Sequence, residues 1–214
     1  MSIGIIGAGA LGSSIARLLA RNGIAATIAN RRGPQSLASL VRELGPSITA
    51  GTVEKAASAD IVFVAVRWVD TEQALRNLPA WNGRIVIDGT NPVAFLDPDS
   101  ADAKDPTNPL AAYGIKAIDL GDQYSSEVFS QLVPGARVVK AYNHLDANAY
   151  AAPEANGGKR VLFYSGDDAE AKSAVRQLIE GTVFFPVDLG SLETGGRLAA
   201  LPFGALSAHN FIRI

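Results

Sequence analysis

Three glycines close to the start of the chain have the spacing of a phosphate-binding turn. The apolar run at 3–6 leads into Gly7-x-Gly9-x-x-Gly12, and a helical pattern follows. In such a turn the first glycine makes the tight bend, the second lets a pyrophosphate approach the backbone, and the third lets helix and strand pack closely. Free N–H groups and the positive dipole at the start of the helix also favour a diphosphate. The sequence therefore predicts that a dinucleotide binds at Gly7, Ala8, Gly9, Ala10, Leu11 and Gly12.

The end of the next apolar run indicates which dinucleotide is bound. An NAD site carries Asp or Glu at this strand end, whereas this chain has Asn30, Arg31 and Arg32. Two guanidinium groups suit a dianionic 2′-phosphate, and no carboxylate is present to repel it. We therefore expect NADP as the cofactor. The alternatives are a sharp glycine bend without a ligand and an ordinary solvated loop for the arginine pair.

Composition excludes several other classes of function. The 214 residues are 48% hydrophobic, enough to bury a full core as one domain or as a domain with a small appendage. The net charge of −2, without a block of like charges, argues against nucleic acid or an anionic membrane as a partner. Without Cys, and with two His but no metal-ligand spacing, no disulfide, thiol chemistry or metal site is expected. With no membrane-length apolar run and no room for a signal peptide before the first strand, a cytoplasmic protein with a small-molecule substrate is expected.

Apolar runs alternate with helical patterns along the chain, which is typical of β-α-β units around a parallel sheet. Strands are expected near 3–7, 25–29, 47–50, 60–66, 84–88, 116–119, 137–142, 160–164 and 182–187. Helices are expected near 10–22, 34–44, 53–57, 70–77, 123–133, 168–180 and 191–212. The run at 92–112, rich in Pro and Asp, is expected to be a long irregular loop. Together these patterns predict a doubly wound α/β fold with a mostly parallel sheet.

Residues that follow the later strands are expected to surround the nicotinamide, because ligands of open parallel sheets lie outside the carboxyl ends of the strands. The additional cofactor-binding candidates are Val66, Arg67, Asn91, Pro92, Ala141 and Asn143. The candidates for binding the second substrate are Trp68, Thr90 and Tyr142. Thr90, Asn91 and Asn143 offer hydrogen bonds to the carboxamide of the nicotinamide. Trp68 and Tyr142 offer flat faces for a second ring.

An acid–base pair for carbonyl reduction is not evident in the sequence. A carbonyl reductase needs a proton donor beside the hydride site, and no Tyr-x-x-x-Lys pair is present. His144 is the one weak catalytic candidate, and a structural hydrogen bond is the alternative role for it. Hydride transfer between two ring cofactors depends mainly on proximity and orientation, so a site without such a pair fits that chemistry.

The motifs together resemble those of the coenzyme F-420-dependent NADP oxidoreductases, which are NADPH-dependent reductases of a deazaflavin. The resembling stretches cover almost the whole chain in order: 3–12, 30–37, 59–66, 87–92, 139–143, 165–172 and 186–190. The resemblance implies a single Rossmann-like domain, a homodimer, and hydride exchange between NADP and C5 of the deazaflavin. It also implies that the 7–12 turn and residues 30–32 bind NADP. Tyr142 stands where the family pattern Lys-Ala-Phe-Asn has Phe.

The expected organisation is an NADP-binding domain over 1–190 and a broken helical segment over 191–214, within the same domain or at the dimer interface. The apolar residues that favour an interface role are Leu198, Leu201, Phe203, Leu206, Phe211 and Ile212. The expected activity is hydride transfer between NADPH and coenzyme F-420 or a similar flat ring. The alternatives are reduction of a free flavin, quinone, ferric complex or imine, and NADPH-dependent regulation without turnover.

Overall fold

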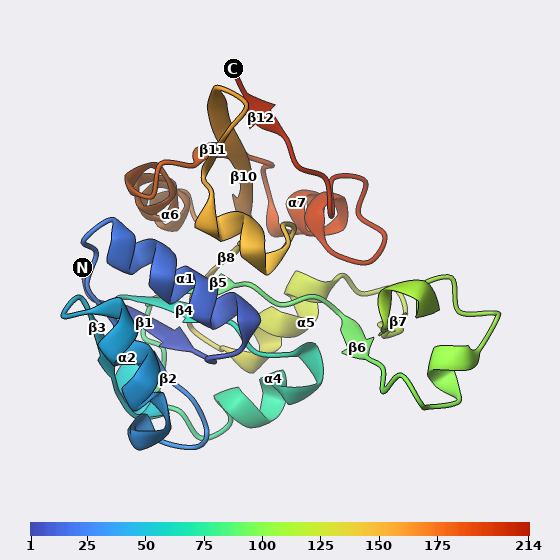
Figure 1. Cartoon of the computed structure of the whole chain (residues 1–214), viewed down its shortest axis with the longest axis horizontal. Coiled ribbons are helices and arrows are strands. Elements are labelled where there is room, and N and C mark those ends of the chain that lie inside the picture. Colours follow the sequence, from blue (N-terminus) through green and yellow to red (C-terminus); the bar gives the residue numbers. More distant parts are fainter.

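A single twisted sheet forms the centre of the protein, as the computed structural model of residues 1–214 shows (Figure 1). Its strand order is β11-β10-β8-β5-β4-β1-β2-β3. The strands are β1 (Ile3–Ile6), β2 (Ala26–Ala29), β3 (Ile48–Ala50), β4 (Ile61–Val64), β5 (Ile85–Asp88), β8 (Arg137–Ala141), β10 (Gly158–Gly166) and β11 (Phe185–Asp188). The strands from β3 to β8 are parallel, β10 is antiparallel to β8, and β11 is parallel to β10. The predicted α/β fold with a mostly parallel sheet is confirmed.

Helices cover both faces of this sheet, so the central strands are buried on both sides (Figure 1). The helices are α1 (Ala10–Arg21), α2 (Ala38–Leu44), α3 (Val53–Ala57), α4 (Trp68–Leu75), α5 (Ser125–Leu132), α6 (Ala169–Gly181) and α7 (Leu192–Ala199). One core lies between the sheet and α1 and α6, with Ile5 and Phe63 at its centre. The other lies between the opposite face and α3, α4 and α5, with Val62 and Phe129 at its centre. Successive strand residues alternate between the two cores, because their side chains point to opposite faces.

The chain order reverses at β1, which places the expected ligand site. Strands β2 and β3 extend the sheet on one side of β1, and β4, β5 and β8 extend it on the other. The carboxyl ends of all these strands meet at one edge because they are parallel. A crevice for a ligand is expected at such a switch in strand order.

A small ribbon lobe, defined here as residues 93–117, stands beside the main body (Figure 1). It contains the antiparallel pair β6 (Val93–Phe95) and β7 (Ile115–Ala117) and two short 3₁₀ turns, η2 (Asp102–Lys104) and η3 (Ala111–Tyr113). The strand expected near 116–119 therefore exists but belongs to this lobe and not to the main sheet. Its exposed Lys116 breaks the apolar run that a strand buried on both faces requires. The remainder of 92–112 is largely irregular, as predicted.

The C-terminal segment is broken, as expected, but the part after the break is not helical. The helix expected over 191–212 ends at Ala199, and Ala200 adopts an extended conformation. Pro202 lacks the N–H that would continue the helix and restricts the residue before it, which explains the early end. After turns at 201–208 the chain forms β12 (Ile212–Arg213), which pairs with β10, as does β9 (Glu154–Ala155). None of the helices combines the length and apolar character needed to cross a membrane.

Candidate functional site

The glycine turn after β1 has the geometry that the sequence predicts. Gly7 has a φ of 108°, and a Cβ built on it would lie 2.3 Å from the Ala65 carbonyl oxygen. A Cβ on Gly12 would lie 2.0 Å from the Gly7 carbonyl oxygen. A Cβ on Gly9, in contrast, would meet nothing within 4 Å. Gly7 and Gly12 are therefore required for packing, whereas Gly9 leaves open space over the backbone where a pyrophosphate would lie.

The start of α1 presents free donors to this open space. Gly9 is the N-cap of α1, and no side chain caps the helix or places a carboxylate in its first turn. The Gly9 backbone carbonyl accepts the Ser13 N–H at 3.0 Å, which is the first hydrogen bond of the helix. The N–H groups before Ser13 have no partner within the helix and are directed outward. Ala8 and Leu11 are half-buried, and Ala10 is exposed. The helix end thus offers hydrogen-bond donors and partial positive charge to an anion.

The end of β2 presents two free guanidinium groups. The Asn30 side chain shapes this turn, because its Oδ1 accepts the Arg32 backbone N–H at 2.9 Å and its Nδ2 donates to Ser36 Oγ at 3.0 Å. Arg31 and Arg32 are both exposed, and neither side chain forms an ion pair or hydrogen bond within the chain. Both charges are therefore available to a phosphate.

The residues after β4 lie next to the glycine turn. Val66 Cγ1 would lie 3.0 Å from a Cβ on Gly7, so Val66 borders the turn directly. Arg67 is exposed, and its Nε lies 3.8 Å from Asp70 Oδ2. Trp68 begins α4 and is half-buried. This segment therefore offers a cation and one partly open aromatic face at the switch in strand order.

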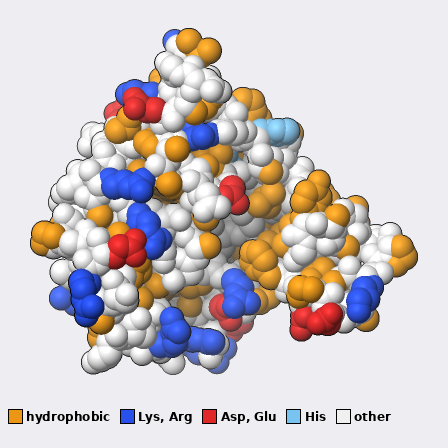
Figure 2. All heavy atoms as spheres, in the orientation of Figure 1, with side chains coloured by type: hydrophobic (Ala, Val, Ile, Leu, Met, Phe, Trp, Pro, Cys, Tyr) orange, Lys and Arg blue, Asp and Glu red, His pale blue; other side chains and the backbone are white.

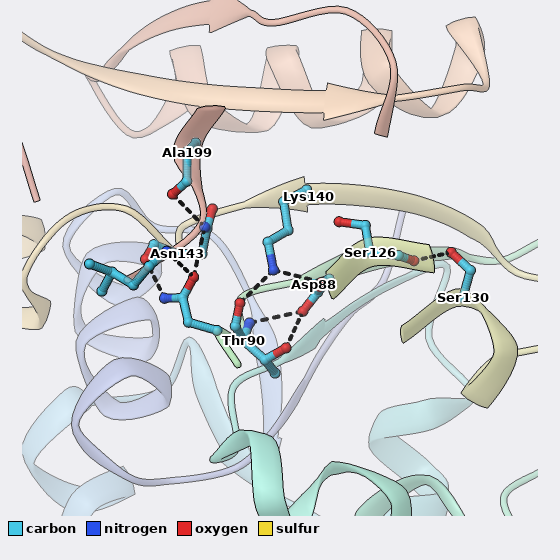
Figure 3. A network of polar contacts seen from close by, with 9 residues as sticks. Asp88, Thr90, Ser126, Ser130, Lys140, Asn143 and Ala199 are labelled. Carbon is cyan, nitrogen blue, oxygen red and sulfur yellow. Dashed lines mark hydrogen bonds and ion pairs between the residues drawn. The ribbon is translucent and has the colours of Figure 1, made fainter. Parts of the chain in front are cut away.

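Two asparagine side chains join three separate segments at the carboxyl edge (Figure 3). Asn91 Nδ2 donates to the Asn143 carbonyl oxygen at 2.7 Å, and Asn143 Nδ2 donates to Asn91 Oδ1 at 3.1 Å. Asn143 Nδ2 also donates to the Ala199 carbonyl oxygen at 3.0 Å, and the Leu201 N–H donates to Asn91 Oδ1 at 3.0 Å. The loops after β5 and β8 and the segment after α7 are thereby held together.

The asparagine pair keeps one donor and one acceptor unused. Asn91 Oδ1 accepts two hydrogen bonds and its Nδ2 donates one, so one N–H of its amide remains free. Asn143 Nδ2 donates two hydrogen bonds, so its Oδ1 remains as a free acceptor. The two backbone carbonyl partners fix which amide atom is nitrogen in each case. One unused N–H on Asn91 and one unused oxygen on Asn143 are the two kinds of group that a primary carboxamide needs as partners.

A buried ion pair lies beside the asparagine pair, at the ends of β5 and β8 (Figure 3). Lys140 Nζ lies 2.8 Å from Asp88 Oδ2, and the two side chains are 1% and 0% exposed. Asp88 Oδ1 accepts the Thr90 N–H at 2.9 Å and the Thr90 hydroxyl at 2.6 Å, while Lys140 Nζ donates to the Thr90 carbonyl oxygen. Every polar atom of Thr90 is thus bonded inside the protein. Thr90 is therefore corrected from a substrate-binding candidate to a structural residue.

The structure also corrects the expectation for Tyr142. This residue has a φ of 61°, which turns its side chain away from the carboxyl edge and into the first core. Its ring lies 5.1 Å from that of Phe63 and 5.6 Å from that of Tyr150, measured between centroids. Burial raises the pKa of the Tyr142 hydroxyl far above its usual value. A side chain in this position cannot present its face to a second substrate. Ala141 is likewise wholly buried, and Pro92 is buried beside Asn91.

His144 is placed as a core residue. Both of its ring nitrogens are buried without a hydrogen-bond partner, and its ring centroid lies 4.8 Å from that of Phe163. Burial lowers the pKa of His144 to about 4, weakly opposed by the nearby Val161 backbone. The ring is therefore neutral near pH 7 and is not positioned to give a proton to a substrate.

Sequence reasoning did not find the Asp88–Lys140 pair or the part of the site contributed by Ala199 and Leu201. The signal for the pair was present, since a charged residue interrupts an apolar run at the end of each of two adjacent buried strands. Buried charges are expected to be paired. No local pattern indicates Ala199 and Leu201, because their contacts with Asn143 and Asn91 join residues far apart in the sequence.

Part of the chain matches a family of oxidoreductases, and two solved structures are similar to it over nearly its whole length. Residues 2–92 match the family described as NADP oxidoreductase, coenzyme F-420-dependent. A hypothetical protein from Sinorhizobium meliloti is 38% identical, with a TM-score of 0.86 over 100% of this chain and 97% of that one. A structure described as a putative F-420-dependent NADP reductase from Arthrobacter sp. is 26% identical, with a TM-score of 0.72 over 91% of this chain and 86% of that one.

Two further similarities are more limited in what they show. The rat metalloreductase STEAP3 is 28% identical over 206 residues, which is 95% of this chain but 37% of that protein. The chain therefore spans little more than a third of the length of this curated relative. A reductive aminase from Aspergillus terreus, solved with NADPH, is 21% identical, with a TM-score of 0.61 over 94% of this chain and 57% of that one. The latter similarity shows the fold alone.

Substituting the glycines of the turn separates binding from folding. Gly9→Val is expected to abolish NADP binding while the protein stays folded, because Gly9 has extended backbone and open space that the side chain would fill. Gly12→Val is expected to lower the unfolding midpoint strongly, because its Cβ would overlap the Gly7 carbonyl. Calorimetric titration with NADP and thermal unfolding followed by circular dichroism measure the two effects. Retained micromolar NADP binding by Gly9→Val would place the cofactor elsewhere.

Burial of His144 predicts acid sensitivity of the folded state. The unfolded chain binds a proton on this His below about pH 6.5, whereas the folded protein excludes it down to a pKa of about 4. Stability is therefore expected to fall by about 2 kcal/mol from this group between about pH 7 and about pH 5. Urea unfolding at both pH values should show that His144→Leu removes this part of the loss, while the exposed His209→Leu keeps it. Equal pH dependence of the wild type and His144→Leu would contradict the assignment.

Proposed function

Because the chain belongs to the family of coenzyme F-420-dependent NADP oxidoreductases, we propose that it transfers a hydride between NADP(H) and a flat heteroaromatic ring, with the deazaflavin F-420 as the acceptor. The observation that carries the proposal is the open space over Gly9 with two unpaired guanidinium groups beside it. When bound, NADPH supplies the hydride. The protein must then bind the cofactor, orient its nicotinamide and admit the second ring.

The phosphate groups of the cofactor would bind at the exposed part of the site, which is formed by the glycine turn and the two arginines after β2. The pyrophosphate would lie over Gly9 and accept hydrogen bonds from the N–H groups at the start of α1. The 2′-phosphate would lie between Arg31 and Arg32, which have no other partner. The free Nδ2–H of Asn91 and the free Oδ1 of Asn143 would receive the carboxamide oxygen and nitrogen of the nicotinamide.

The acceptor ring would lie on the outer side of the nicotinamide. Trp68 is the remaining aromatic candidate, since it is half-buried at the start of α4 next to the switch in strand order. The space-filling view has a recess between the main body and the ribbon lobe (Figure 2), and this recess would admit a flat ring. Thr90 is bonded internally and His144 is buried, so neither is placed as a proton donor. A site that works without these two groups fits ring-to-ring hydride transfer, which depends on placement.

A free flavin, a quinone or a ferric complex is the second candidate for the acceptor. The observation in its favour is the 28% identity to a metalloreductase over 95% of the chain. An imine acceptor is supported only by the shared fold of the reductive aminases. The other alternative is a regulatory protein that binds NADPH without turnover. Similarity to a family of oxidoreductases does not support it.

A homodimer stays a prediction for this chain. Among the apolar residues of the C-terminal segment, Phe203 is 71% exposed and Phe211 is 41% exposed. Leu198, Leu201 and Leu206 are instead partly buried against the protein's own body. We propose that the exposed part of this segment contributes to contacts between two copies.

Arg31→Ala tests the assignment of NADP. The substitution is expected to weaken NADP binding about tenfold or more and to leave NAD binding nearly unchanged, because one charge-assisted hydrogen bond to a phosphate contributes about 1.5–3 kcal/mol. Isothermal titration with both cofactors measures the effect. Arg42→Ala is the matched control, since Arg42 is also exposed and unpaired but lies on α2. Equal affinity of the unaltered protein for NADP and NAD would refute the assignment.

Deuterium transfer from labelled cofactor tests the acceptor. NADPH deuterated at C4 is expected to be oxidised fastest in the presence of F-420, and the label should appear at C5 of the reduced deazaflavin. Free flavin, a quinone, ferric citrate and a cyclic imine serve as competing acceptors in parallel assays. The F-420 assignment fails if another acceptor is reduced faster, or if NADPH is oxidised while C5 carries no label.

A further inference from the structure

The buried pair of Asp88 and Lys140 has contacts that the core does not need. The two residues are direct register partners on the adjacent parallel strands β5 and β8, and both are almost wholly buried. Taking two charges out of water is costly, and well-packed apolar residues often give equal or greater stability. Stability alone therefore does not explain this pair, and its other hydrogen bonds indicate a further role.

The remaining bonds of the pair converge on Thr90. Asp88 accepts from both the backbone N–H and the hydroxyl of Thr90, and Lys140 donates to its carbonyl oxygen (Figure 3). These contacts bind the backbone N–H, the backbone carbonyl and the hydroxyl of Thr90 at the same time. Apolar residues of similar size would supply neither a donor to the carbonyl nor an acceptor to the N–H and hydroxyl. The backbone direction at Thr90 is thus fixed by the ion pair.

The next residue in the chain is Asn91, which carries the free amide N–H of the site. Its side-chain oxygen is already bonded to Asn143 and to the Leu201 N–H, so its amide plane is fixed as well. A shift of the backbone at Thr90 would move this amide relative to the free oxygen of Asn143. Positions of reacting groups matter at this scale, since a displacement of about 1 Å can cost about a hundredfold in rate.

We propose that Asp88 and Lys140 are positioning residues that fix the loop at Thr90 and Asn91, so that the free donor of Asn91 and the free acceptor of Asn143 bind a primary carboxamide in one orientation. The inference rests on the proposed function, because the carboxamide is that of the nicotinamide. A carboxamide held in one orientation presents one face of the nicotinamide to the acceptor. The ion pair thereby determines which of the two hydrogens at C4 is transferred.

The first experiment measures carboxamide recognition by binding alone. The 3-acetylpyridine analogue of NADP replaces the amide nitrogen by a methyl group, which cannot donate to Asn143 Oδ1. The unaltered protein is expected to bind NADP about two- to tenfold more tightly than the analogue, the range for one neutral hydrogen bond. Lys140→Met is expected to bind both with equal affinity. Equal affinity in the unaltered protein, or an unchanged preference in Lys140→Met, would overturn the proposal.

The second experiment follows hydride transfer with NADPH deuterated separately at the two C4 positions. Lys140→Met is expected to lower turnover at least tenfold, to weaken NADP binding less than that because the phosphate contacts are intact, and to transfer hydrogen from both positions. The double variant Asp88→Asn with Lys140→Met removes both charges and should regain thermal stability. Its turnover and stereospecificity should stay low, because the Thr90 carbonyl still lacks its donor.

Val139→Ala is the matched control for loss of stability. Val139 is wholly buried on β8 next to Lys140, but it makes no polar contact with the loop at Thr90. A cavity at Val139 should lower the unfolding midpoint while preserving the preference for NADP over its analogue and the transfer from one C4 position. If Val139→Ala impaired both readouts as Lys140→Met does, or if the double variant recovered both, the pair would be merely structural. Failure of the proposed function is distinct, because it would appear as absence of NADP binding or turnover in the unaltered protein.

Discussion

Every polar backbone atom buried at the carboxyl edge of the sheet needs a partner, and this requirement arranges the candidate site. Strand ends leave N–H and carbonyl groups without a neighbour, and an unpaired buried group costs as much as a lost hydrogen bond. Here side chains supply the partners. Asp88 and Lys140 satisfy the backbone of Thr90, and the asparagine pair satisfies the carbonyls of Asn143 and Ala199. The same contacts that stabilise the edge therefore fix the groups that would meet a nicotinamide.

The two ends of the proposed cofactor site are held in different ways. The phosphate end depends on space and charge, because Gly9 leaves the backbone uncovered and Arg31 and Arg32 extend into solvent. The nicotinamide end depends on buried polar contacts, with Asn143 only 4% exposed. Contacts of exposed arginines are screened by salt, whereas buried hydrogen bonds are little affected. Affinity for the cofactor would therefore come largely from the first end, and orientation from the second.

Sequence patterns are sufficient for the parts of the site that depend on local geometry. The glycine turn and the strand end at Asn30 follow from spacing within a single β-α-β unit, and the structure has the predicted elements there. Tyr142 could not be placed in the same way, because a φ of 61° reverses the direction that strand alternation implies. The roles of Thr90 and Lys140 depend on which strand lies beside β5, and only the sheet topology shows that this is β8. Pro202 indicates a break in the last helix, but no local pattern indicates that the residues after it return to pair with β10 as β12.

The bond between the Leu201 N–H and Asn91 joins residues that are 110 positions apart. During synthesis, β1, α1 and the turn at residues 30–32 are made long before residue 201. The phosphate end would then exist in a nascent protein whose nicotinamide end is still incomplete. Non-local contacts of this kind form late because loop closure precedes any gain from them. Binding of phosphate groups therefore needs less of the fold than orientation of a ring, which waits until residues 199–201 dock on the asparagine pair.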